Sequence, residues 1–146
     1  MYHRIIPSAD GVQRPHPLLE TGVPIWDAQK PHPFVPELVV GTLDEAAFAH
    51  LVRQDYRYLL DYARVFAVAG TKARDEETMT HLLGVGHRML NVELDLQREF
   101  AADYDIAVEV LERVEKAPSC VAYTSFLVRM AHDSLAEIAA AIYPCG

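Results

Sequence analysis

The sequence predicts an all-α fold, and three observations support this prediction. Apolar residues recur at steps of three and four along most of residues 42–143, which is the spacing of one face of an α-helix. No segment shows the sustained alternation of apolar and polar residues that indicates a strand. Between Gly41 and Ala117 there is no proline to interrupt a helix. Packing of helices against one another is then the way in which these apolar faces become buried.

The first part of the chain has a different composition. Seven of the nine prolines lie before residue 37. Each proline fixes its own φ and disfavours a helical conformation in the residue before it. We therefore expect residues 1–24 to form an extended, Pro-rich arm and residues 25–146 to form a helical domain. The length of 146 residues fits one such domain.

The first helix of the body is expected to begin at a capping box, Thr42-Leu43-Asp44-Glu45. In this motif the Thr side chain bonds the third amide of the helix and the Glu side chain reaches back. A loop at residues 70–75 is expected to end the helix. Its apolar face consists of Phe48, Leu51, Val52, Leu59, Tyr62, Ala63 and Phe66.

Four more helices are expected to follow. The apolar face of the second runs through Met79, Leu82, Met89, Leu90, Leu96 and Phe100. Asp105 is expected to cap a short third helix that ends before Pro118, and a fourth begins at about Ser119. A second capping box, Ser134-Leu135-Ala136-Glu137, predicts a fifth helix that runs to Tyr143.

Charge and composition disfavour several classes of protein. The 13 Lys and Arg residues stand against 21 Asp and Glu residues, a net charge of −8, whereas nucleic-acid-binding proteins carry a basic surface. No apolar run is long enough to span a bilayer, and residues 1–20 lack the apolar core of a signal peptide. Two cysteines do not make a disulfide framework. We expect a cytoplasmic protein with no membrane or nucleic-acid partner.

Asp55 interrupts the apolar face of the first helix, one turn from both Leu51 and Leu59. A carboxylate at a core-facing position is costly unless it is hydrogen-bonded. One interpretation is a tie between helices, in which a Tyr, an Arg or a backbone amide of a neighbour donates to Asp55. The other is a binding site, in which Asp55 accepts a hydrogen bond from a ligand N–H inside the bundle. The spacing alone leaves both open.

Tyr58 lies three residues after Asp55, so the two side chains are neighbours on the helix surface. An acid beside an aromatic ring suits a flat heterocycle, because the ring stacks on one face and the acid binds the edge. An ordinary aromatic core position is the more common alternative. Glu93 interrupts the second apolar face in the same way, although Arg88 and Arg98 are placed to pair with it at the surface.

The other reactive residues form no recognisable site by spacing alone. His81 and His87 do not share a helix face, and no set of Cys or carboxylate residues completes a metal site, so no metal is expected. Cys120 is typical of a core position. Cys145 follows Pro144 directly, and a small buried hydrophobe is the ordinary interpretation of such a cysteine.

Two groups of motifs stand in an order and spacing that are specific when taken together. The first group is His32-Pro33-Phe34-Val35, Gly41-Thr42-Leu43, Gln54-Asp55-Tyr56-Arg57-Tyr58-Leu59 and Tyr62-Ala63-Arg64-Val65-Phe66-Ala67. The second group is Ala122-Tyr123-Thr124-Ser125, Leu135-Ala136-Glu137-Ile138-Ala139-Ala140-Ala141 and Pro144-Cys145. On these motifs, about residues 25–145 resemble the TenA family, the thiaminase II proteins.

This resemblance implies an all-helical, heme-oxygenase-like bundle that binds a pyrimidine and holds no heme or other cofactor. It implies hydrolysis of an aminopyrimidine, or of thiamine, to hydroxymethylpyrimidine in pyrimidine salvage. By the same resemblance, Asp55 binds the amino-pyrimidine edge and Tyr58 stacks on or lines the ring. Tyr123 helps to position the nucleophile, which is Cys145. TenA proteins are typically homotetramers, so a homo-oligomer is expected.

The C-terminus departs from the family pattern. TenA proteins continue past the Pro-Cys motif into helices that carry a glutamate general acid, and this chain ends at Gly146. We therefore expect a C-terminally truncated bundle with an exposed apolar surface. Three functions stay open: the hydrolase, a module that binds a pyrimidine without turnover, and a structural oligomer in which Asp55 is only a tie.

Overall fold

A computed structural model of the chain describes residues 6–7, 13–14 and 17–145. The chain divides into two compact units. One contains Met1–Leu43 together with Tyr143–Gly146, and the other is Asp44–Ile142. The prediction of an all-α fold is confirmed, apart from one short pairing of two-residue strands in the first unit.

The described residues of the first unit form two strands and three helices. Strand β1 (Ile6–Pro7) pairs antiparallel with β2 (Gln13–Arg14), so that Ile6 lies opposite Arg14. They are followed by α1 (Pro17–Gln29) and α2 (Phe34–Val40), and the 3-10 turn η2 (Tyr143–Cys145) completes the unit. The ring of Trp26 in α1 lies 6.4 Å from that of Tyr143, measured between centroids.

The extended conformation expected for the N-terminal arm is wrong for residues 17–24, which belong to α1. Pro17 is the first residue of this helix and Pro36 lies in the first turn of α2, where the missing amide hydrogen costs nothing. Pro24 lies in the interior of α1. Most of the remaining expected arm, residues 1–5, 8–12 and 15–16, lies outside the described residues. Prolines at helix starts were therefore misinterpreted as a sign of extended chain.

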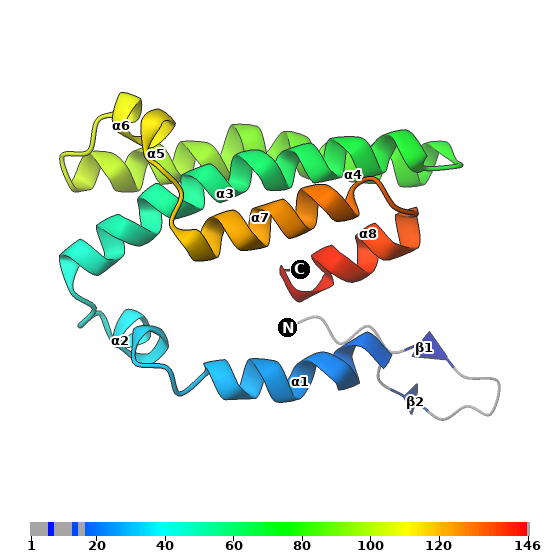
Figure 1. The fold of residues 1–146 in the computed structure, drawn as a ribbon, viewed down its shortest axis with the longest axis horizontal. Helices are drawn as coiled ribbons and strands as arrows, with labels where there is room; N and C mark the ends of the chain where they lie inside the picture. The colour runs from blue at the N-terminus through cyan, green and yellow to red at the C-terminus, as the bar shows by residue number, and fades with distance from the viewer. Residues whose placement is uncertain (1–5, 8–12, 15–16, 146) are drawn as a thin grey trace. The chain divides into compact units, whose positions relative to one another are not determined.

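The second unit is built around α3 (Glu45–Lys72), a helix of 28 residues. Figure 1 shows α4 and α7 running along it, while α8 packs against α7. The other helices of this unit are α4 (Glu76–Arg88), the π-helical turn η1 (Met89–Glu93), α5 (Leu94–Asp103), α6 (Val108–Arg113), α7 (Pro118–Met130) and α8 (Leu135–Ile142). Because α3 contacts α4, α5, α6, α7 and α8, its side chains organise the unit.

Capping residues fix where several of these helices begin. The capping box predicted at Ser134 is confirmed, because the backbone amide of Ser134 donates to Glu137 Oε2 (2.9 Å) and the hydroxyl of Ser134 donates to the same oxygen (2.6 Å). Helix α3 is capped by Asp44 rather than Thr42, since Asp44 Oδ1 accepts from the amides of Ala46 and Ala47. Asp105 does not cap α6, whose N-cap position is Ala107.

The apolar face predicted for the second helix is partly wrong, and a π-helical turn explains why. Leu90 and Leu96 are 45% and 40% exposed, whereas Leu94 is only 2% exposed. The amide of Leu94 bonds the carbonyl of Met89, five residues back instead of four. This turn takes up one extra residue, which rotates everything that follows by about 100° relative to a continuous α-helix. The face that packs on α3 therefore changes phase after Met89.

Two groups of buried side chains form the core of the second unit, and both include α3. One lies toward the start of α3 and contains Ala49, Val52, Tyr56, Leu59, Leu94, Ala101, Ile106 and Leu111. The other lies toward its end and contains Tyr62, Val65, Phe66, Ala69, Leu127, Ala131, Ile138 and Ala141. Tyr58 packs against both groups, so it marks the point on α3 where they meet. Across the described ranges, no helix combines the length and the apolar character that a membrane crossing requires.

Candidate functional site

Asp55 lies on the part of α3 that faces α5, and its side chain is half-buried. Its Oδ2 accepts a hydrogen bond from Gln97 Nε2 at 2.6 Å. The acid is therefore tied to a neighbouring helix, although the donor is a glutamine amide and not the Tyr, Arg or backbone amide that we expected. The tie also does not use up the carboxyl group, since a carboxylate has acceptor positions on both oxygens.

The surroundings of Asp55 disfavour its charged form. Burial raises the pKa of the Asp55 carboxyl, and the negative charge of Glu93 raises it further. Glu93 is exposed, and its expected surface partner Arg98 pairs instead with Asp95 at 2.6 Å. An acid with a perturbed pKa, held by a single hydrogen bond inside a bundle, is suited to bind an N–H group or to exchange a proton with a ligand.

Gln97 was not singled out by the sequence, and the π-helical turn is the reason. A regular helix through Met89 places Leu96 toward α3, whereas the extra residue in η1 places Leu94 and Gln97 there instead. Gln97 Oε1 is buried and has no hydrogen-bond partner among the residues that the structure describes. A buried amide oxygen without a donor costs stability, so this atom needs an explanation.

One turn from Asp55, three tyrosines form an aromatic stack. The ring of Tyr58 lies 5.1 Å from that of Tyr62 at an interplanar angle of 24°, and 5.9 Å from that of Tyr123 at 11°. Tyr58 and Tyr62 belong to α3, and Tyr123 belongs to α7. The fold thus brings Tyr58 and Tyr123 together beside the helix turn that carries Asp55.

Cys145 is described only as the last residue of η2, in the first unit, and its side chain lies outside the described part. Its pairing with Asp55 stays a prediction. Cys120 is half-buried on α7, and its thiol donates to the carbonyl of Gln54 (3.8 Å). Burial raises the pKa of Cys120, so its thiol stays protonated at neutral pH.

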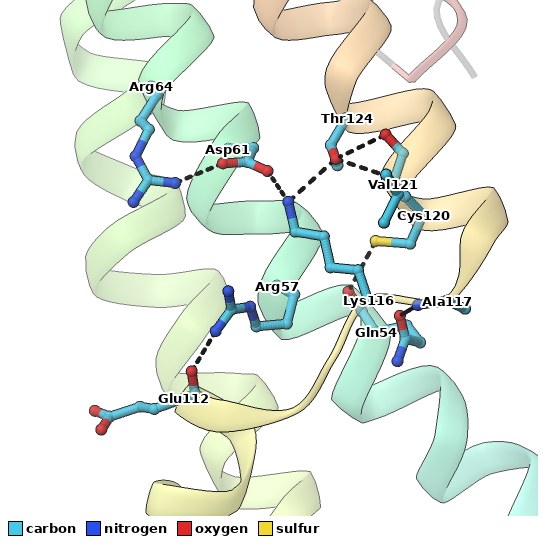
Figure 2. Close-up of polar contacts among 10 residues, drawn as sticks. All are labelled: Gln54, Arg57, Asp61, Arg64, Glu112, Lys116, Ala117, Cys120, Val121 and Thr124. Carbon is cyan, nitrogen blue, oxygen red and sulfur yellow. Dashed lines mark hydrogen bonds and ion pairs between the residues drawn. The ribbon is translucent and has the colours of Figure 1, made fainter.

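A polar network joins α3 to the segment that leads into α7, as Figure 2 shows. The ammonium group of Lys116 pairs with the carboxylate of Asp61 and also donates to Thr124 Oγ1 at 3.1 Å. Gln54 Oε1 accepts from the amide of Ala117 (2.7 Å), and Gln54 Nε2 donates to the carbonyl of Glu115 (3.1 Å). These contacts fix the start of α7.

The spacing of residues gave no signal for the pair of Asp61 and Lys116, because the two lie on different elements far apart in the chain. Burial raises the pKa of Asp61, but the hydrogen bond and charge of Lys116, followed by those of Arg64, lower it by more, so that the net pKa lies below the usual value. Asp61 is therefore charged at neutral pH and serves as a structural partner of Lys116.

Three surface hollows described among residues 28–114 do not include Asp55 in their linings. One of about 600 Å³ is lined by Glu45, Phe48, Phe100, Asp103, Tyr104 and Asp105. Within the described ranges, no three His, Cys, Asp or Glu side chains come together as they do around a metal ion. The combination of a half-buried acid, an unpartnered amide oxygen and stacked aromatic rings thus distinguishes the Asp55 region from the rest of the unit.

Residues 20–146 match the model of the TENA/THI-4/PQQC family. The chain belongs to this family. A curated TenA-type relative, the "aminopyrimidine aminohydrolase" of Halalkalibacterium halodurans, is 42% identical over 129 residues. Another protein of the same name, from Helicobacter pylori, is 32% identical over 130 residues. Each alignment covers 88% of this chain, but only 58% and 60% of the relative. The chain thus spans about three fifths of the length of these TenA relatives.

Solved structures of TenA proteins have the same fold. A TenA homologue from P. horikoshii OT3 aligns with a TM-score of 0.82 at 29% identity, over 88% of this chain and 60% of the other. A structure from Silicibacter sp. TM1040, named a TenA family transcription regulator, gives the same TM-score and identity over 57% of its length. The resemblance to the TenA family and the helical bundle that it implied are both confirmed.

Proposed function

We propose that this chain provides the pyrimidine-binding part of an aminopyrimidine aminohydrolase of the thiaminase II type. The observation that carries the proposal is the position of Asp55, a half-buried acid one turn from the stacked rings of Tyr58 and Tyr123. An acid beside an aromatic surface matches a flat nitrogen heterocycle, because the acid binds N–H groups on its edge and a ring packs on its face.

The relatives support this substrate class. Proteins named aminopyrimidine aminohydrolase occur among the matches from three bacteria, at 30% identity or more. Because the chain spans only part of their length, its substrate and its activity remain part of the proposal. A homo-oligomeric assembly and a cytoplasmic location are proposed with it.

The proposed reaction uses a covalent intermediate. The thiolate of Cys145 adds to the electron-poor pyrimidine ring, and the electron pair of the ring bond moves onto a ring nitrogen. Asp55, hydrogen-bonded to the amino-pyrimidine edge, orients the ring for this addition. The amino group takes a proton from water and leaves the methylene carbon as ammonia, the hydroxide so formed adds in its place, and the ring expels the sulfur as thiolate. Tyr58 lines the ring and Tyr123 positions the sulfur.

The proposal is tested by incubating the protein with an aminomethylpyrimidine and measuring hydroxymethylpyrimidine and ammonia. We expect turnover that is lost in Cys145→Ser and strongly reduced in Asp55→Asn. Turnover that persists in Cys145→Ser would show that Cys145 is not the nucleophile.

Binding without turnover is the alternative function, and calorimetry distinguishes it. An aminopyrimidine that binds the unaltered chain, fails to bind Asp55→Asn and is not hydrolysed by either would support a binding module. Absence of both binding and turnover would overturn the proposed function and leave Asp55 as a structural tie.

A further inference from the structure

Gln97 hydrogen-bonds to Asp55, and only half of its amide is used. Its Nε2 donates to Asp55 Oδ2 at 2.6 Å. Its Oε1 is buried and has no donor among the described residues. Elsewhere in the same unit, the comparable amide of Gln54 uses both of its polar atoms, one toward Glu115 and one toward Ala117. The two glutamines therefore differ in a way that a purely structural role does not explain.

The hydrogen bond between Gln97 and Asp55 leaves two acceptors for a ligand, Gln97 Oε1 and the other carboxyl oxygen of Asp55. Oε1 is bonded to the same amide carbon as Nε2, which donates to the carboxyl group, so it lies beside this hydrogen bond. The terminal torsion of a glutamine has a broad preference, so a small rotation can turn Oε1 toward a ligand. Both Oε1 and the free oxygen of Asp55 accept hydrogen bonds, and neither donates one when Asp55 is charged.

A pair of neighbouring acceptors selects a ligand that carries two N–H donors. An exocyclic amino group on an aromatic ring has two N–H bonds in the plane of the ring, whereas a ring carbonyl in the same place presents only lone pairs. A carbonyl opposite two acceptors leaves buried polar atoms unpaired, which disfavours binding strongly.

We propose that Gln97 is a specificity-determining residue of the site, which accepts one N–H of a ring amino group through Oε1 while Asp55 accepts another. This inference rests on the proposed function and adds to it the residue that distinguishes amino from oxo heterocycles. The π-helical turn η1 contributes indirectly, because it brings Gln97 to the face of α5 that packs on α3.

The test compares two probes, an aminopyrimidine and the oxopyrimidine that carries a carbonyl oxygen in place of the amino group. Calorimetry gives the ratio of their dissociation constants for the unaltered chain, for Gln97→Met and for the matched control Gln54→Met. We expect the unaltered chain to prefer the amino probe and Gln97→Met to reduce that preference by about 5- to 100-fold. Gln54→Met is expected to lower the Tm without changing the ratio, because its amide holds only the loop before α7.

The outcomes separate this inference from the function on which it rests. If the unaltered chain binds neither probe, the proposed function fails. If it binds the amino probe and Gln97→Met leaves the ratio unchanged, the inference about Gln97 is overturned. Should Gln97→Met not fold, Gln97→Ala replaces it, since it also removes the acceptor oxygen without adding a charge beside Asp55. Gln97→Ala is expected to reduce the preference for the amino probe, and an unchanged ratio would contradict the inference.

Discussion

Asp55 occupies a position that lowers the stability of the folded chain. Burial and the charge of Glu93 raise its pKa, which means that the folded state binds its proton more tightly than the unfolded state does. The stability that Asp55 contributes is therefore highest below its ordinary pKa of 3.8. This contribution decreases as the pH rises through the folded-state pKa, and it stays low at higher pH. A charge kept at such a position is typical of a binding or catalytic group.

Asp55→Asn is accordingly expected to stabilise the protein at neutral pH. The asparagine oxygen can still accept from Gln97, while the buried charge and its repulsion by Glu93 are removed. We expect the Tm at pH 7 to rise, on the order of a few degrees, and the gain to disappear below about pH 3.8. Thermal unfolding at pH 3 and pH 7 measures both. A lower Tm at pH 7 would show that the charge stabilises the fold.

Asp61 has the opposite effect on stability, because its pKa is lowered. Asp61 and Lys116 are only 14% and 19% exposed, and removing the charge of one leaves the other buried without its partner. Asp61→Asn is expected to cost about 2 kcal/mol at pH 7, a decrease in Tm of about 4–8 °C. This contribution is fully present above pH 3.8, the ordinary value for Asp, and is lost as the pH falls through the lower folded-state pKa.

Arg64 provides the matched control for Asp61. It also pairs with Asp61, at 2.5 Å, but its side chain is 66% exposed. Arg64→Gln is expected to change the free energy of unfolding by about 0.5 kcal/mol or less, as is usual for an exposed ion pair. Urea unfolding of both variants measures the difference. Equal effects would mean that Lys116 adds nothing to the stability of the second unit.

For individual helices, the sequence predicted boundaries correctly where near neighbours determine them. It predicted the buried face wrongly where the helix geometry changes partway along. The loop expected at residues 70–75 is shorter in the structure, because α3 continues to Lys72. The capping box at Ser134 follows from residues that interact with their near neighbours. The apolar face of the second helix could not be predicted in this way after Met89, because a π-helical turn such as η1 has no reliable sequence signal and is stabilised by tertiary packing. The helix at Pro17 was missed because proline is favourable at a helix start and unfavourable elsewhere.

The π-helical turn gives a prediction about deletions. If η1 is one extra residue inside an otherwise continuous helix, removing the exposed Asn91 restores a regular helix and leaves Leu94 and Gln97 facing α3. We expect the Asn91 deletion to unfold cooperatively with a Tm close to that of the unaltered chain. Deletion of the exposed Ser125, in the middle of regular α7, is expected to abolish cooperative unfolding. Similar loss of cooperativity in both deletions would contradict this interpretation of η1.

The candidate site was predictable only in part, for physical reasons that differ between its residues. Asp55 and Tyr58 follow from helix spacing, and Tyr123 came from the family resemblance, since nothing in its own neighbourhood distinguishes it. Gln97 was hidden by the phase change at η1. The role of Lys116 could not be predicted, because its partner Asp61 lies on α3 and only tertiary packing brings the two together.

For the whole molecule, we propose that association between copies covers exposed apolar side chains. In the first unit, Val39 and Val40 on α2 are 79% and 67% exposed, and in the second unit Val92 is 58% exposed. Apolar surface of this kind is usually covered in proteins that stay in solution. We expect sedimentation velocity to detect species at multiples of the 16.4 kDa chain mass. A monomer at every concentration tested would contradict the expected homo-oligomer.

The proposed function depends on Asp55 binding the edge of an aminopyrimidine within the second unit. A calorimetric titration of the unaltered chain and of Asp55→Asn with an aminopyrimidine tests this. A charge-assisted hydrogen bond of this kind is worth about 1.5–3 kcal/mol, so we predict binding that weakens by about 10- to 100-fold in Asp55→Asn while the fold is retained. Equal affinity in the two proteins would contradict the claim.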